Sequence, residues 1–156
     1  MHCTVRLLLL GAFVPLLVKA HVRLTWPPAR FPALDFLDNT RTPPPCGVPK
    51  PEDKDAMYTS LPAGTHLNIN WFMSYPHQGG YRLQLLDAQD RPIRYLTPED
   101  GSWVGANDQT KQTASVQLPT EPCDRCTLRL ERQANEWGSY SFWSCADVDI
   151  VNEQDN

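Results

Sequence analysis

The residue with the most specific chemistry is a histidine that signal-peptide cleavage would place at the N-terminus. Val18-Lys19-Ala20 has the small residues of a signal-peptidase site, so cleavage after Ala20 would expose His21. An N-terminal histidine offers two metal-binding nitrogens, its α-amino group and its imidazole Nδ1. One more imidazole would complete a T-shaped set of three nitrogens, which suits Cu(II). The alternative is that histidine stands at the new N-terminus by chance.

Two further histidines remain after such cleavage. His66 follows a Pro-Ala-Gly-Thr turn at the start of an alternating segment, which is typical of an ordinary, partly exposed histidine. His77 lies in a Pro/Gly-rich loop immediately before another alternating segment. Loops held by a rigid sheet often carry functional residues, although an exposed turn histidine would show the same pattern.

The elements that must position these residues are strands. Short segments with alternating apolar and polar residues are separated by turn residues, which predicts an all-β, immunoglobulin-like or fibronectin-III-like β-sandwich. These segments are 67–72, 81–86, 115–118, 127–132, and 140–142 leading into 146–151. Between Trp26 and Asp55, prolines at 27, 28, 32, 43, 44, 45, 49 and 51 predict a long Pro-rich N-terminal loop packed on the sandwich.

The start, the end and the charge of the chain indicate a secreted protein. Residues 1–20 have the organisation of a signal peptide, with Arg6 before an apolar stretch at 7–18. Removing 20 of the 156 residues leaves 136, at 21–156, which suits a single domain. Loss of Arg6 and Lys19 changes the formal charge from −4 to −6, which argues against nucleic acid as a partner.

No later apolar stretch approaches the roughly 18 residues that span a membrane, and the chain ends in polar residues. We therefore expect an extracellular monomer with no membrane anchor.

Four cysteines remain after cleavage: Cys46, Cys123, Cys126 and Cys145. An even number in a small secreted domain predicts two disulfides, for which three pairings are possible. Cys123-x-x-Cys126 could also indicate a zinc or redox site, but no second CxxC supports that reading in an oxidising compartment. We favour one bridge between Cys123 and Cys126 across a tight turn and another between Cys46 and Cys145.

Four segments in this chain, taken in order, resemble motifs of one enzyme family. They are His21-Val22-Arg23-Leu24-Thr25-Trp26-Pro27-Pro28-Ala29-Arg30, His77-Gln78-Gly79-Gly80-Tyr81, Cys123 to Arg132 followed by Asn135-Glu136-Trp137-Gly138, and Phe142-Trp143-Ser144-Cys145-Ala146-Asp147-Val148. The family is the lytic polysaccharide monooxygenases, copper enzymes on an immunoglobulin-like sandwich, related in fold to chitin-binding type-4-like domains. The animal branch, auxiliary-activity family 15, is the most similar, although the His77 motif has one extra glycine.

The resemblance implies a histidine brace, in which one copper ion is bound by the amine and Nδ1 of His21 and by Nε2 of His77. Phe142 would occupy an axial side of the copper without coordinating it. The implied reaction is oxidation at C1 or C4 of a glycosidic bond in chitin or cellulose, using an external electron donor. This reaction needs no pair of carboxylates, unlike ordinary glycoside hydrolysis.

The resemblance also implies roles for neighbours of the metal. Ala134 corresponds to the family's small residue beside the copper. Gln133 or Glu131 would be the hydrogen-bonding group that orients a bound oxygen species. Tyr140 and Trp143 could carry oxidising holes away from the metal or simply pack.

The chain also departs from the family pattern. It is shorter, with fewer cysteines and trimmed loops on the substrate face, and Trp103 could be either a sugar-stacking residue or a buried core residue. An alternative function is therefore a secreted, non-catalytic histidine-brace protein for copper binding or transport. Asp35 or Asp38 reaching the metal would favour that alternative. A third reading is a metal-free sandwich that binds carbohydrate or protein.

Overall fold

The computed structural model describes residues 22–30, 44–46, 49–52, 55–73, 76–106, 108, 110–136 and 140–152. The predicted signal peptide, His21 and most of the predicted Pro-rich loop, including Asp35 and Asp38, lie outside these residues. Within the described part of the chain there is no helix with the length and hydrophobicity that a bilayer crossing requires.

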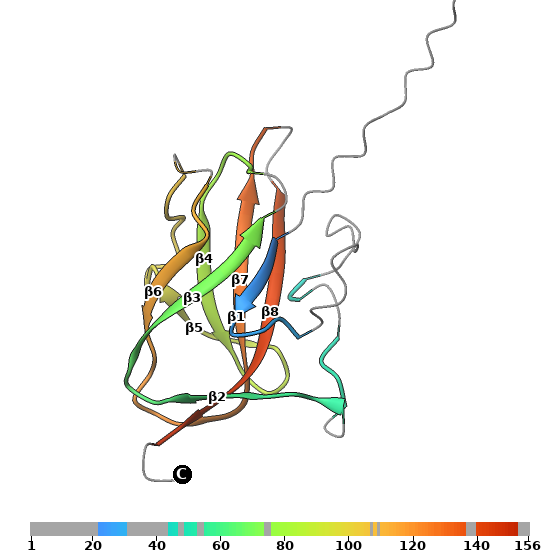
Figure 1. Ribbon diagram of the computed structural model, residues 1–156, viewed down its shortest axis with the longest axis vertical. Helices are drawn as coiled ribbons and strands as arrows, with labels where there is room; N and C mark the ends of the chain where they lie inside the picture. Colours follow the sequence, from blue (N-terminus) through green and yellow to red (C-terminus); the bar gives the residue numbers. More distant parts are fainter. Residues whose placement is uncertain are drawn as a thin grey trace, which may run out of the picture.

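Eight strands form two packed sheets, so the all-β sandwich prediction is confirmed (Figure 1). The three-stranded sheet has the order β1(Val22–Trp26), β3(His66–Met73), β6(Thr113–Gln117). The five-stranded sheet has the order β2(Thr59–Pro62), β8(Tyr140–Val151), β7(Cys123–Ala134), β4(Tyr81–Leu86), β5(Pro92–Thr97). Neighbouring strands are antiparallel except for β2, which pairs parallel with β8.

The core lies between the sheets, and the alternation of residues along each strand decides which side chains enter it. In β3, Ile69, Trp71 and Met73 are buried, whereas Phe72 between them is exposed on the outer face. In the opposite sheet, Leu128 and Leu130 of β7 are fully buried. Burial of this apolar surface supplies the main driving force for the sandwich.

The predicted segments match the strands to different degrees. The segment 81–86 coincides with β4, and 67–72 falls within β3. The segments 140–142 and 146–151 belong to one continuous strand, β8, which pairs with β7 along nearly all of its length. Strands β1, β2 and β5 were not predicted; β2 has only four residues, and β5 has little alternating burial.

Both predicted disulfides are present, Cys46–Cys145 and Cys123–Cys126. Cys46 and Cys145 are buried together with Leu86 in a small second cluster, apart from the main core. The long-range bridge therefore attaches the segment that contains Cys46 to the outer side of the five-stranded sheet.

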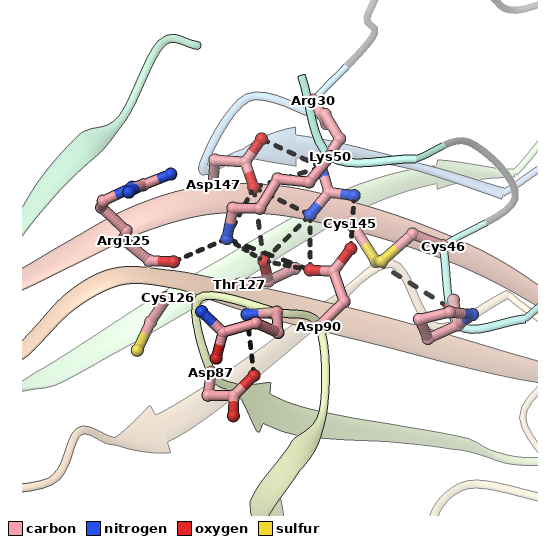
Figure 2. Close-up of polar contacts among 12 residues, drawn as sticks. Arg30, Cys46, Lys50, Asp87, Asp90, Arg125, Cys126, Thr127, Cys145 and Asp147 are labelled. Atoms are coloured by element: carbon pink, nitrogen blue, oxygen red, sulfur yellow. Dashed lines mark hydrogen bonds and ion pairs between the residues drawn. A yellow bond between two sulfur atoms is a disulfide. The ribbon is translucent and has the colours of Figure 1, made fainter. Parts of the chain in front are cut away.

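A charged cluster fastens the N-terminal part of the chain to the same sheet (Figure 2). Arg30 donates hydrogen bonds to both carboxylate oxygens of Asp147 and to both of Asp90, at distances of 2.8 to 3.1 Å. Lys50 Nζ donates to Arg125 O at 2.6 Å and to Thr127 Oγ1 at 2.9 Å. The two cations and two carboxylates in this cluster compensate one another where they are largely removed from water.

Candidate metal centre

Five strands begin or end at one end of the sandwich. β1 begins there, β3 ends, β4 begins, β7 ends and β8 begins (Figure 1). Val22, the first described residue, pairs with Met73 at the end of β3. The loop between β3 and β4 carries His77 to this end of the molecule, and the predicted ligand His21 directly precedes Val22 in the sequence.

His77 is buried, with a 3% exposed side chain, although it lies in a loop. Its ring stacks on Phe142 of β8, with the ring centroids 5.3 Å apart and the ring planes inclined by 23°. His77, a predicted metal ligand, and Phe142, the predicted axial residue, are therefore neighbours. An exposed turn histidine, the alternative that the sequence allowed, does not describe this residue.

A carboxylate fixes the orientation of the His77 ring. Glu136 Oε2 lies 3.1 Å from His77 Nδ1, and an ionised carboxylate only accepts hydrogen bonds, so Nδ1 carries the proton. A neutral imidazole with its proton on Nδ1 has its lone pair on Nε2, which is then the nitrogen that can bind a metal. Histidine ligands of metals usually donate their other N–H to a carboxylate or carbonyl in this way.

The Glu136 carboxylate has a second partner in the same loop. Its Oε1 accepts a hydrogen bond from Gln78 N at 2.5 Å. Partial burial raises the pKa of Glu136, but the hydrogen bonds from Gln78 N and from His77 outweigh burial and hold that pKa below its ordinary value. Glu136 therefore stays ionised as an acceptor for both loop residues. In the sequence, Glu136 stands out only as part of the Asn-Glu-Trp-Gly motif, because a contact between residues 59 positions apart has no local signal.

Two glycines let the loop approach the neighbouring backbone closely. A Cβ at Gly79 would lie 2.8 Å from Gln133 O, and the φ of +127° there disfavours other residues. A Cβ at Gly80 would lie 2.7 Å from the Cβ of Trp103. Packing against Gln133 therefore requires glycine at position 79, and packing against residues 103–104 requires it at position 80.

The other predicted neighbours divide between the two faces of the five-stranded sheet. Ala134 is fully buried on the core face of β7, as Phe142 is on β8. Glu131 and Gln133 alternate with Ala134 and point to the opposite face. There Glu131 Oε2 accepts a hydrogen bond from Arg82 Nε at 2.8 Å. Gln133 Oε1 lies 3.5 Å from Gly80 N.

The remaining candidates are three aromatic residues and one histidine. Trp103 is half-buried, with the Arg82 guanidinium 4.3 Å from its ring centroid, so one side of the ring is covered by a cation. Trp143 is half-buried, and the side chain of Tyr140 lies outside the description. His66 is exposed at the start of β3, as expected for an ordinary histidine.

Among the described residues, no group of three or more His, Cys, Asp and Glu side chains could hold a metal ion. The predicted ligand His21, with two nitrogens, lies outside the described residues.

No protein-family model and no curated protein sequence matches this chain. Several solved structures do match it. A lytic polysaccharide monooxygenase AA15 from Thermobia domestica, in the Cu(I) state, superposes with a TM-score of 0.54 at 15% identity, covering 83% of this chain and 98% of that one. A chitin-binding domain from Burkholderia pseudomallei gives 0.51 at 13% identity, covering 85% and 100%.

A cellulose-active polysaccharide monooxygenase from M. thermophila is also similar, with a TM-score of 0.46 at 16% identity, covering 62% of this chain and 55% of that one. The first two likenesses establish that this chain has the β-sandwich fold of lytic polysaccharide monooxygenases and chitin-binding domains.

Proposed function

We propose that this protein is a secreted copper protein of the lytic polysaccharide monooxygenase type, with a histidine brace made by His21 and His77. The observation that carries the proposal is the state of His77, a buried imidazole stacked on Phe142 with Nδ1 bound to Glu136. That arrangement leaves Nε2 as the ligand atom. The fold shared with a copper-containing monooxygenase supports the same reading.

The chain supplies chemistry suited to copper at each proposed position. Imidazole and amine nitrogens are ligands that Cu(II) prefers, and the α-amino group of His21 has an ordinary pKa of about 7.7 to 8.0, so its proton is readily displaced. Phe142 would place an apolar ring beside the metal and block a further ligand from binding on that side. Glu136 would hold the His77 ring in place. When bound, copper supplies the one-electron oxygen chemistry that oxidises a glycosidic carbon.

The proposed substrate is an insoluble polysaccharide, chitin or cellulose, with an external electron donor. The similar structures include a chitin-binding domain and a polysaccharide monooxygenase. The two disulfides agree with an extracellular location, because such bridges persist in oxidising compartments.

The first test is Cu(II) titration, followed by electron paramagnetic resonance, on protein that begins at His21. We expect one tight site with an axial, three-nitrogen spectrum. An additional residue before His21 removes the amine ligand and should abolish tight binding, as should His77→Ala. The matched control is His66→Ala, which removes an exposed histidine from the other end of β3 and should leave binding unchanged.

Tight binding that survives both the blocked amine and His77→Ala would contradict the histidine brace. If the brace is present, product analysis on chitin and on cellulose with a reductant tests the enzymatic part of the proposal. Oxidised oligosaccharides would support the monooxygenase function. Copper binding without product on either polymer would instead favour the non-catalytic copper-binding alternative.

A further inference from the structure

Strand β7 places a cation inside the core. Arg132 is 1% exposed and belongs to the same face as Leu128 and Leu130. A charged side chain away from water is costly unless its hydrogen-bonding groups are satisfied. Among the described residues, Arg132 has no carboxylate within ion-pair distance, in contrast to Arg30, which is buried against two. The described hydrogen-bond partners of Arg132 are neutral groups instead.

Those partners are the backbone carbonyls of residues 77–80, which we call the His77 loop. Arg132 Nη2 donates to His77 O at 2.9 Å. Arg132 Nη1 donates to Gly80 O at 2.7 Å and also to Gly79 O. Its Nε lies 3.4 Å from Met73 Sδ, where β3 ends. One guanidinium therefore binds three carbonyls of the loop and touches the strand from which the loop leaves.

Further hydrogen bonds to the carbonyls of the His77 loop come from β7 and the residue after it. Gln78 O accepts from Asn135 N at 2.9 Å, and Gly80 O also accepts from Gln133 N at 2.8 Å. With the bonds from Arg132, every carbonyl from 77 to 80 has a donor. Among these donors, only Arg132 approaches from the core side.

We propose that Arg132 is a positioning residue, whose guanidinium shapes the His77 loop and so sets where the His77 imidazole lies. The consequence for a metal rests on the proposed function, but the effect on the loop does not. Three carbonyls that converge on a core position need several donors in a fixed plane. Arginine has five donors in such a plane, whereas lysine has a single point charge with three rotating donors.

The electrostatics agree with this role. Burial lowers the pKa of Arg132, while the charges of Glu136 and Asp108 act to raise it. Glu136 holds the same loop through Gln78 N and His77 Nδ1. The His77 loop is therefore held between a cation on its carbonyls and an anion on its donors, an arrangement that fixes the backbone and the ring together.

The first experiment uses metal-free wild-type protein labelled with ¹⁵N and ¹³C. We expect slowly exchanging Arg132 Nη protons and through-hydrogen-bond couplings to the carbonyl carbons of the His77 loop. Rapidly exchanging Nη protons without such couplings would overturn the proposal, and this outcome does not depend on any variant folding or on copper.

The second experiment compares Arg132→Lys with Leu130→Ala, a cavity variant on the same face of β7. With Arg132→Lys we expect faster amide exchange at 78–80 and more than one set of His77 imidazole signals. Leu130→Ala should lower the melting temperature yet keep a single set. Equal disturbance of the loop in both variants would mean that Arg132 acts only through general stability, and would overturn the proposal.

Copper titration separates this proposal from the proposed function. Arg132→Lys should bind Cu(II) roughly 10- to 100-fold more weakly than wild type, the range typical for groups that support a ligand. Absence of copper binding by wild-type protein would refute the brace and leave the loop experiments valid. Tight wild-type binding with an undisturbed loop in Arg132→Lys would refute the role of Arg132 alone.

Discussion

At the scale of single residues, Glu136 decides which nitrogen of His77 carries the proton. Its two oxygens serve two donors, Gln78 N and His77 Nδ1. Glutamine has one acceptor oxygen and one NH₂ group, so Glu136→Gln must set its NH₂ against one of these donors. We expect the preference for the Nδ1–H tautomer to be lost and Cu(II) affinity to fall roughly 10- to 100-fold. Imidazole ¹⁵N shifts and copper titration measure both effects.

The control for that substitution is Glu121→Gln, on an exposed residue outside the site. It should change neither the imidazole shifts nor the affinity. Unaltered His77 shifts in Glu136→Gln would show that the ring is oriented by other contacts, its stacking on Phe142 included.

The same scale shows what the sequence could and could not predict about the site. His77 and Phe142 were predicted from motifs, and the structure brings them into contact. Arg132 and Glu136 were not predicted, because their roles depend on a loop more than fifty residues away. A local signal for Arg132 did exist, since alternation from Leu128 and Leu130 puts residue 132 on the core face.

At the scale of elements, the cluster around Arg30 holds the N-terminal segment against β7 and β8. Burial raises the pKa of Asp90, but hydrogen bonds from Arg30 and Thr127 outweigh it and bring that pKa below its ordinary 3.8. A carboxylate with a lowered folded-state pKa stabilises the protein above its unfolded pKa. That stability is lost as the pH falls through the folded-state pKa. Stability should therefore fall as the pH drops below about 4.

Asp90→Asn tests this contribution. Asparagine tolerates the left-handed φ of 57° at this turn, so the backbone should be kept. We expect a loss of roughly 1 to 3 kcal/mol in the free energy of unfolding at neutral pH, and a shallower loss of stability in acid. Denaturant unfolding at pH 7 and pH 3.5 measures both. Asp124→Asn, on an exposed residue, is the control, and identical acid profiles for both variants would contradict the role of Asp90.

Sequence patterns predict strands that depend on local properties and miss those that depend on distant pairing. β4 was predicted with correct bounds because both its length and its alternation are local properties. β2 has only four residues and exists because it pairs with β8, almost ninety positions later. The segments 140–142 and 146–151 form one strand, β8, because its pairing with β7 continues through residues 143–145.

At the scale of the whole molecule, the five-stranded sheet is held on both sides. Its inner face packs on the three-stranded sheet, and on its outer face it is bound by Arg30, Cys46 and Lys50 (Figure 2). The site lies at the end where β7 and β8 meet, the strands to which these residues are bound (Figure 1). A long-range constraint on β8 therefore bears on the strand that carries Phe142.

The two disulfides allow that constraint to be measured, because they differ greatly in the loop they close. Cys46–Cys145 spans 99 positions and Cys123–Cys126 spans 3. In the chain-entropy estimate, a bridge closing about 100 residues stabilises by about 4.7 kcal/mol, and one closing about four residues by about 2 kcal/mol. Disulfides commonly deliver less than this estimate, so replacing both cysteines of the long bridge by alanine should lower the free energy of unfolding by roughly 2 to 4 kcal/mol, and replacing those of the short bridge should cost less. Denaturant unfolding of the two double variants gives the comparison. An equal or larger loss for the short bridge would mean that Cys123–Cys126 stabilises the bulge at the start of β7 through native-state contacts rather than through chain entropy.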